Sequence, residues 1–144
     1  MLKAVSHVTL WVHDQDEALA FYTDKLGCEL REDVTVEEMD NFRWLTVGAP
    51  NQPDLAITLL RPDTMPASAE TLGKLKDVIA QGAAGGLIFE VEDCRATSEE
   101  LKRKGVEFTQ EPVDQFYGVD AGIRDPFGNQ HRLVQRVPQP AHAG

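Results

Sequence analysis

Three aromatic side chains and one histidine are the residues of this chain best suited to bind a small organic molecule. His7 and Trp11 lie on one predicted strand, and the alternation of side chains along a strand places them on one face together with Thr9. Trp44 and Tyr117 lie on other predicted strands. Aromatic walls with few polar groups are typical of a pocket for a planar organic ligand. The alternative for each aromatic residue is ordinary packing in the core.

Carboxylates are candidates for a general base, but the sequence pairs none of them with a partner. Glu90, Glu107 and Glu111 fall on predicted strands and loops. A catalytic base must lie within hydrogen-bonding reach of the proton that it removes, and carboxylates of an acidic protein are more often solvated. The Ser, His and Asp residues show no nucleophile-elbow or triad pattern. The sequence therefore identifies no catalytic residue.

The first half of the chain predicts a strand, a helix and three further strands. Residues 5–12 alternate polar and apolar side chains, with β-branched residues among them. Asp14 is a candidate N-cap for the helix that follows, and Gly27 stands where a left-handed C-cap is expected. The three further strands are predicted over residues 28–36, 42–47 and 55–60.

The second half repeats this order of elements. A strand over residues 86–91 is followed by Asp93 as a candidate N-cap, and Gly105 ends the predicted helix. Agreement in strand, cap, helix length and C-terminal glycine is the mark of an internal repeat. Further strands are predicted from Val106, over 116–124 and over 130–137, and a helix between the halves over 68–81.

The repeat predicts a single α+β domain over residues 1–144. We expect two tandem βαβββ modules that form a half-barrel sheet around a central cavity, into which every second strand residue points. The expected segments are module 1 at about 4–62, a linker with a helix at 63–84, module 2 at about 85–137 and a frayed tail at 138–144.

Composition excludes several classes of partner. The net charge of −10 disfavours nucleic acid and anionic membranes, because both would repel the protein surface. No apolar run approaches the ~20 residues that span a bilayer, and the first residues lack the pattern of a signal peptide. Cys28 and Cys94 are expected to be reduced. These observations predict a cytoplasmic protein.

The motifs resemble those of the vicinal oxygen chelate superfamily, which includes glyoxalase I, extradiol dioxygenases, and fosfomycin- and bleomycin-resistance proteins. The resemblance covers roughly residues 4–137 and implies the glyoxalase/bleomycin resistance/dioxygenase fold. By its own residue types, the Asp125–Asn129 segment is a turn that directs the last strand. The residues that carry the resemblance are His7-Val-Thr-Leu-x-Val12, Phe21-Tyr22, Leu26-Gly27, Val91-x-Asp93, Gly105-Val106, Tyr117-Gly118 and Asp125-Pro-Phe-Gly-Asn129.

The resemblance also implies where a metal ion would be held. Metal-dependent members take two ligands from each half, and the corresponding positions here are His7, Thr58, Gly86 and Arg132. Glycine has no ligand atom, threonine is a poor ligand and arginine has no lone pair to donate, whereas a divalent ion needs about three protein ligands. Shifting the alignment by one residue brings in His131, but turns it to the other strand face. We therefore expect no cofactor, with divalent Fe, Mn, Ni or Zn only as the less favoured alternative.

Arg132 has two possible roles. Beside His7 it can bind an anionic or carbonyl oxygen of a ligand, or it can pair with an internal carboxylate such as Glu90. His7 itself can be a ligand contact or a hydrogen-bonded core residue. The predicted ligand-binding residues are His7, Trp11, Trp44, Thr58, Glu90, Tyr117 and Arg132.

The favoured function is metal-independent binding of a small aromatic or carbonyl-bearing molecule in the central cavity, similar to the bleomycin-resistance type. One alternative is a metal-dependent lyase or extradiol dioxygenase with a displaced ligand set. Another is a metal-free enzyme in which His7 and Arg132 polarise a carbonyl, so the sequence leaves open whether the protein is an enzyme. The resemblance also implies a homodimer.

Overall fold

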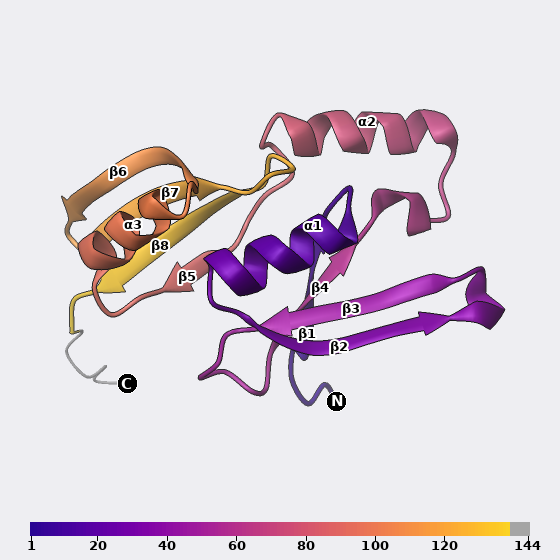
Figure 1. Cartoon of the computed structure of the whole chain (residues 1–144), viewed down its shortest axis with the longest axis horizontal. Coiled ribbons are helices and arrows are strands. Elements are labelled where there is room, and N and C mark those ends of the chain that lie inside the picture. Colours follow the sequence, from indigo (N-terminus) through magenta and orange to yellow (C-terminus); the bar gives the residue numbers. More distant parts are fainter. Residues whose placement is uncertain (139–144) are drawn as a thin grey trace. The chain divides into compact units, whose positions relative to one another are not determined.

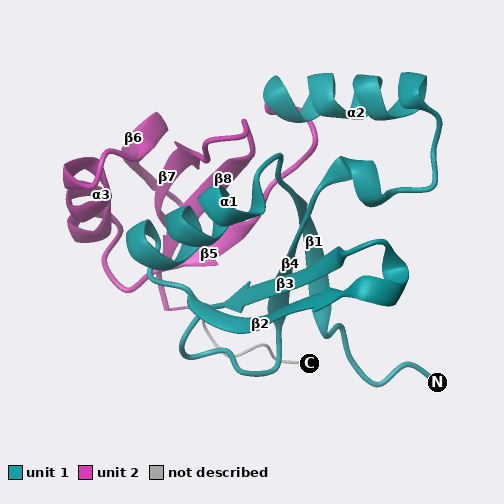
Figure 2. Ribbon diagram, turned by 45° about the vertical axis from the view of Figure 1, so that its right-hand side comes forward, with its two compact units in different colours: residues 1–81 teal, residues 82–144 magenta. Residues whose placement is uncertain are grey.

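A computed structural model describes residues 1–138, so the predicted tail lies outside the described residues except for Pro138. The chain divides into two compact units, residues 1–81 and 82–144, which Figure 2 colours separately. Each unit contains one four-stranded sheet (Figure 1). The division falls within the predicted linker.

Unit 1 contains four strands and two α-helices. Short 3-10 turns at Glu37–Met39 and Pro62–Thr64 follow the second and fourth strands. The elements are β1 His7–Trp11, α1 Gln15–Ala20, β2 Glu29–Val36, β3 Phe42–Gly48, β4 Ala56–Leu60 and α2 Ala69–Ala80.

Unit 2 repeats the order of one strand, one helix and three strands. The strands predicted to begin at residues 86 and 116 begin two residues later, because Gly86 and Tyr117 stand outside the paired segments. The elements are β5 Ile88–Glu90, α3 Cys94–Arg103, β6 Glu107–Gln115, β7 Gly118–Arg124 and β8 Gln130–Arg136.

The two sheets have the same topology. Their strand orders are β1-β4-β3-β2 and β5-β8-β7-β6. In each sheet the first pair in this order is parallel and the other two pairs are antiparallel. The α+β fold of two tandem βαβββ modules is therefore confirmed.

The helix predicted between Asp14 and Gly27 is less regular than the sequence indicates. The Asp14 carboxylate accepts a hydrogen bond from the Glu17 backbone N–H at 2.9 Å, as expected of an N-cap. After Ala20 the chain continues as a π-helical turn over Phe21–Lys25. Gly27 then ends it with φ of +80°, the left-handed conformation that glycine adopts without strain.

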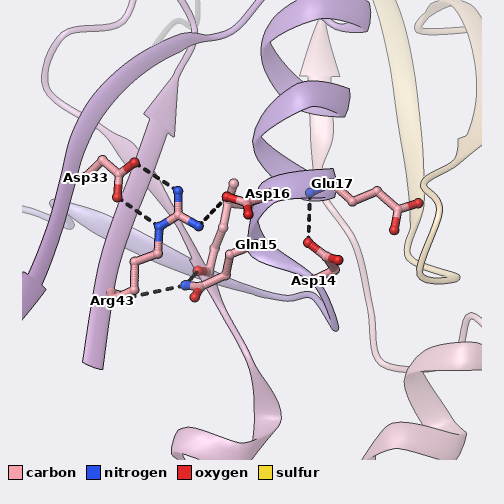
Figure 3. Close-up of polar contacts among 7 residues, drawn as sticks. Asp14, Gln15, Asp16, Glu17, Asp33 and Arg43 are labelled. Carbon is pink, nitrogen blue, oxygen red and sulfur yellow. Dashed lines mark hydrogen bonds and ion pairs between the residues drawn. The ribbon is translucent and has the colours of Figure 1, made fainter. Parts of the chain in front are cut away.

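Polar contacts attach the start of α1 to its sheet (Figure 3). The Arg43 guanidinium on β3 donates to Asp33 on β2 at 2.9 Å and to Asp16 on α1 at 2.7 Å. The Gln15 amide donates to the carbonyl oxygens of Arg43 and Leu59. The hydrogen bonds of Arg43 lower the pKa of Asp33, so this carboxylate stays ionised. These contacts fix α1 on one face of the first sheet and leave the opposite face to other residues.

The turn between β7 and β8 is held by one buried carboxylate. Asp125 accepts hydrogen bonds from the backbone N–H of Phe127 at 3.0 Å and of Asn129 at 2.8 Å. The Asn129 side-chain amide donates to the same carboxylate at 2.8 Å. The segment thus has the structural role that its residue types predict, and it fixes where β8 begins.

Within residues 1–138 no helix is long and apolar enough to cross a bilayer.

Candidate functional site

One face of the first sheet carries the predicted ligand-binding residues of unit 1. Leu10, Leu45 and Leu59 are buried on the side that faces α1. The alternate residues point the other way, and the register pairs Thr9 with Thr58 and Thr58 with Thr46. We call this side the Trp44 face, defined by His7, Thr9, Trp11, Trp44, Thr46 and Thr58.

Two rings meet across the Trp44 face. The ring centroids of His7 and Trp44 are 5.4 Å apart, and the ring planes are tilted by 55°. His7 stands two residues before Thr9 on β1, whereas Trp44 stands two residues before Thr46 on the antiparallel β3. With ordinary strand spacing and rise, these two Cα atoms are about 16 Å apart along a diagonal of the sheet. Both side chains must therefore lean inward, and the centre of the diagonal is Thr58.

Two threonines of the Trp44 face are buried without hydrogen-bond partners among the described residues. Thr58 is 2% exposed and Thr46 is 0% exposed. Neither Oγ1 atom forms a hydrogen bond with any described residue. An unpaired buried hydroxyl costs about 1–3 kcal/mol relative to a hydrated one. The Trp44 face therefore retains unused hydrogen-bonding capacity at its centre.

Polar contacts at their edges hold the two rings in place. The Trp44 indole N–H donates to the Glu32 carboxylate at 3.2 Å. His7 Nδ1 lies 2.8 Å from the Ser6 hydroxyl. His7 is exposed, whereas Trp44 and Trp11 are half-buried. Part of the His7 and Trp44 side chains therefore remains accessible to solvent.

In unit 2, Arg132 belongs to a polar cluster on β6, β7 and β8. Its Nε and Nη2 atoms donate to the two carboxylate oxygens of Asp120 at 3.1 and 2.6 Å. Nη2 also donates to the Gln110 side-chain oxygen at 3.1 Å, and the Tyr117 hydroxyl donates to Asp120 at 2.5 Å. A Cβ atom at Gly122 would lie only 3.0 Å from Arg132 Nη1. The absence of a side chain at Gly122 thus makes room for the guanidinium.

The ionisation of this cluster follows from its hydrogen bonds. Burial alone would raise the pKa of Asp120, but the hydrogen bonds from Arg132 and Tyr117 and the Arg132 charge together lower it. The hydrogen bond to Asp120, with desolvation, raises the pKa of Tyr117 and keeps the phenol protonated. Asp120 therefore neutralises the charge of Arg132. A neutralised guanidinium favours binding of a neutral carbonyl oxygen over binding of an anion.

Removing the Asp120 carboxylate is expected to destabilise the protein. Asp120→Asn should lower the free energy of unfolding by about 1–2 kcal/mol at pH 7, because Arg132 is 38% exposed and its charge is partly screened. The pKa of Asp120 is depressed in the folded state. Its stabilisation is therefore present above the unfolded value of ~3.9 and is lost as the pH falls through the folded value.

Urea denaturation of wild type and Asp120→Asn at pH 7 and pH 3 measures this contribution. The difference between the two proteins should shrink at pH 3. A difference that stays constant would show that the charge of Asp120 contributes nothing.

Of the two roles considered for Arg132, the structure shows pairing with a carboxylate, but Glu90 is the wrong carboxylate. The Glu90 side chain is 73% exposed and lies 4.0 Å from Arg136 instead. Sequence reasoning missed Asp120 and Gln110. Asp120 carried a usable signal, since an acidic residue inside an otherwise apolar strand needs a cationic partner.

The strand register locates the four positions at which the sequence resemblance implies metal ligands. Thr9 pairs with Thr58 and Ile88 pairs with Arg132, so Thr58 and Arg132 are equivalent positions in the two modules. His7 and Gly86 each stand two residues before the paired residue of the first strand. This donor set does not fit a divalent ion, because glycine offers no ligand atom and Arg132 is a cation already bound to Asp120.

Gly86 cannot be exchanged for a ligating residue without moving the backbone. A Cβ atom at this position would lie 1.6 Å from the Gln130 carbonyl oxygen, far inside any permitted contact. Across residues 1–138 there is also no group of three or more His, Cys, Asp or Glu side chains that could hold a metal ion.

His131 faces away from Arg132, as strand alternation predicts. It is fully buried, and its Nδ1 accepts a hydrogen bond from the Leu87 backbone N–H at 3.0 Å. Its ring packs edge-on against Phe89 at 5.4 Å between centroids. This histidine joins β8 to the segment before β5 and has a structural role.

His131 is expected to titrate far below an ordinary histidine. Burial lowers its pKa to about 4, although Asp125 acts in the opposite direction. Because the unfolded state binds a proton near pH 6.5 and the folded state does not, stability should fall by up to about 1.4 kcal/mol per pH unit below 6.5. NMR titration of the imidazole signals measures the midpoint directly. A midpoint near 6.5 would contradict the buried neutral ring.

Comparison with known proteins gives the class to which this fold and site belong. Residues 4–133 match the family described as the Glyoxalase/Bleomycin resistance protein/Dioxygenase superfamily. The match covers nearly the whole chain, so the protein belongs to this superfamily, and the resemblance drawn from the sequence motifs is confirmed.

Individual relatives show how close the similarity is. The crystal structure of UcmS2 has a TM-score of 0.86 and 43% identity, and the alignment covers 93% of this chain and 98% of that one. TnmS3, an antibiotic binding protein from Streptomyces sp. CB03234, has a TM-score of 0.73 and 25% identity, with 94% and 98% covered. The Bacillus subtilis (strain 168) protein YurT is 38% identical over 128 residues, which are 89% of this chain and 95% of YurT.

Proposed function

We propose that this protein binds a small aromatic or carbonyl-bearing molecule without a metal ion. The proposal rests on the His7–Trp44 ring pair of the Trp44 face, in which His7 is exposed and Trp44 is half-buried. Planar ligands bind to such rings by offset stacking, and a few polar groups then fix their orientation.

The polar groups of the chain favour a neutral ligand. On the Trp44 face the buried polar groups are threonine hydroxyls, and in unit 2 the charge of Arg132 is neutralised by Asp120. The predicted contacts His7, Trp11, Trp44 and Thr58 remain the proposed contacts of unit 1. In unit 2 they are Tyr117 and Arg132, and Glu90 is a weaker candidate since it is exposed and lies near Arg136. The central cavity stays a prediction.

One relative supports binding as the function. TnmS3 is an antibiotic binding protein with the same fold, and its match covers almost the full length of both chains. By analogy, the ligand of the present protein is an organic molecule of antibiotic size. This analogy agrees with the aromatic residues of the Trp44 face. It does not require TnmS3 to have the same residues at those positions.

A thermal-shift screen of chelator-treated protein tests the proposal. We would use acridone, which is planar, neutral and carries a carbonyl group, with acridine as its carbonyl-free analogue and acridone-10-acetate as its anionic analogue. Acridone should raise the melting temperature most and the anion least. If none of these planar compounds stabilises the protein, or if the anion does so most strongly, the proposed ligand class is wrong.

The enzymatic alternatives make different predictions for the same protein. A metal-dependent lyase or dioxygenase would purify with stoichiometric Fe, Mn, Ni or Zn and would lose ligand binding on chelation. A metal-free enzyme would return a chemically altered ligand. Elemental analysis of the purified protein, with mass spectrometry of the recovered ligand, distinguishes both from a binding protein.

We also propose that the protein is a cytoplasmic homodimer. Cys28 and Cys94 are both free thiols, as is usual in a reducing compartment. The edge strand β2 exposes Leu30 and Val34, and exposed edges of this kind are commonly covered by a second chain. Light scattering after gel filtration should give the mass of a dimer, and the mass of a monomer would contradict it.

A further inference from the structure

We infer that the hydroxyls of Thr58 and Thr46 form a specificity site that donates hydrogen bonds to a neutral carbonyl oxygen of the ligand. The inference rests on the proposed function, because it places the polar end of the aromatic ligand. Beyond the proposed function, the hydroxyl oxygens of Thr46 and Thr58 are the atoms that recognise the ligand oxygen, whereas the rings of His7 and Trp44 contact its planar part.

The two hydroxyls are close enough to act on one atom. Thr46 and Thr58 are direct cross-strand partners, so their Cβ atoms are about 4.5–5.5 Å apart on the same face. A carbonyl oxygen has two lone pairs and can accept one hydrogen bond from each threonine. Both Oγ1 atoms are buried and unpaired within the described part of the chain, so neither has to give up another bond to do so.

The rings of His7 and Trp44 lie where they would hold the rest of such a ligand. Their centroids are 5.4 Å apart, whereas a planar molecule between two rings needs about 7–8 Å. The rings must therefore separate when the ligand enters. Within residues 1–138, His7 has a side-chain hydrogen bond to Ser6 and Trp44 has one to Glu32, and both lie at the ring edges, so the rings can separate without breaking a larger polar network.

The two threonines carry no charge, and the exposed Glu32 carboxylate beside Trp44 repels an anionic ligand, so the class of ligand is neutral. Threonine hydroxyls can donate to a ketone, amide or quinone-type oxygen, but they cannot neutralise a carboxylate or phosphate. The recognised group is therefore a neutral oxygen acceptor attached to a planar ring system.

Isosteric replacement by valine tests the inference through two independent measurements. Thr58→Val and Thr46→Val remove an unpaired hydroxyl and keep the shape, so each should raise the melting temperature of the ligand-free protein by about 2–4 °C. Each should also weaken acridone binding about tenfold, measured by fluorescence anisotropy, and leave acridine binding unchanged. Thr35→Val is the matched control, because Thr35 on β2 is an exposed threonine that pairs with Arg43 and lies outside the Trp44 face.

The possible outcomes separate this inference from the proposed function. If wild type binds acridone and acridine equally and the valine variants change neither, the hydroxyl site is wrong while aromatic binding stands. A fall in melting temperature would also overturn the inference, because it would mean that the hydroxyls are satisfied by bound water in the free protein. If wild type binds neither compound, the proposed function itself fails.

Discussion

Gly86→Ala is expected to lower the free energy of unfolding by about 3 kcal/mol, the upper end of the usual cost of overpacking. The added methyl group would lie 1.6 Å from the Gln130 carbonyl oxygen, which is backbone and cannot rotate away. Relief requires either β8 or the segment before β5 to move, and β8 carries both His131 and Arg132. Urea denaturation followed by circular dichroism measures the loss.

Gly73→Ala in α2 provides the matched control for this substitution. No atom lies within 4 Å of the position that its Cβ would take, and alanine favours a helix over glycine. This variant should gain about 0.5–1 kcal/mol. If Gly86→Ala were as stable as wild type, β8 could shift freely, and a ligating histidine at position 86 would become possible.

Trp44→Ala is expected to weaken the binding of acridone about 30-fold, which corresponds to about 2 kcal/mol. The substitution removes the larger of the two rings that meet over Thr58. It also removes the hydrogen bond to Glu32 but leaves the threonine hydroxyls intact. Fluorescence anisotropy of acridone measures the change, because the emission of acridone is separate from that of tryptophan.

Trp44→Phe is the control that separates stacking from hydrogen bonding. Phenylalanine keeps an aromatic face but cannot donate to Glu32, so we expect a loss of less than about fivefold. If the alanine variant bound acridone as well as wild type does, the Trp44 face would not be the binding surface. A loss in the phenylalanine variant as large as in the alanine variant would assign the effect to the Glu32 contact.

The repeat was readable from the sequence because each module marks its own boundaries. Asp14 and Asp93 cap the first helix of their modules, and Gly27 and Gly105 end those helices with positive φ. These are local signals, set by backbone chemistry within a few residues. Aligning the modules also identified Thr58 and Arg132 as equivalent positions, which the strand register reproduces.

The contacts between strands were beyond sequence reasoning for a physical reason. The sequence offered Glu90 as the partner of Arg132, whereas Asp120 on the antiparallel neighbour β7 is the partner found. The β7–β8 register pairs Arg132 with Gly122, so Asp120 lies two residues away on the same face of β7, and no local sequence pattern gives this register. The contact between the His7 and Trp44 rings spans β4, which lies between β1 and β3. This contact depends on the direction of the side chains as well as on the distance between the strands.

The sequence also does not show why position 86 is a glycine. A missing ligand could be seen from the residue type alone, and it indicated a protein without the family metal. The close approach of the Gln130 carbonyl shows in addition that a side chain is excluded there. This constraint comes from strand packing and carries no local sequence pattern.

The most direct test of the central claim is a titration of acridone into chelator-treated wild-type protein, followed by recovery of the ligand. We expect saturable binding with one dissociation constant, unchanged by added Fe, Mn, Ni or Zn, and recovery of acridone with its mass unaltered. Binding that appears only after a metal is added, or a ligand recovered with a new mass, would contradict metal-independent binding.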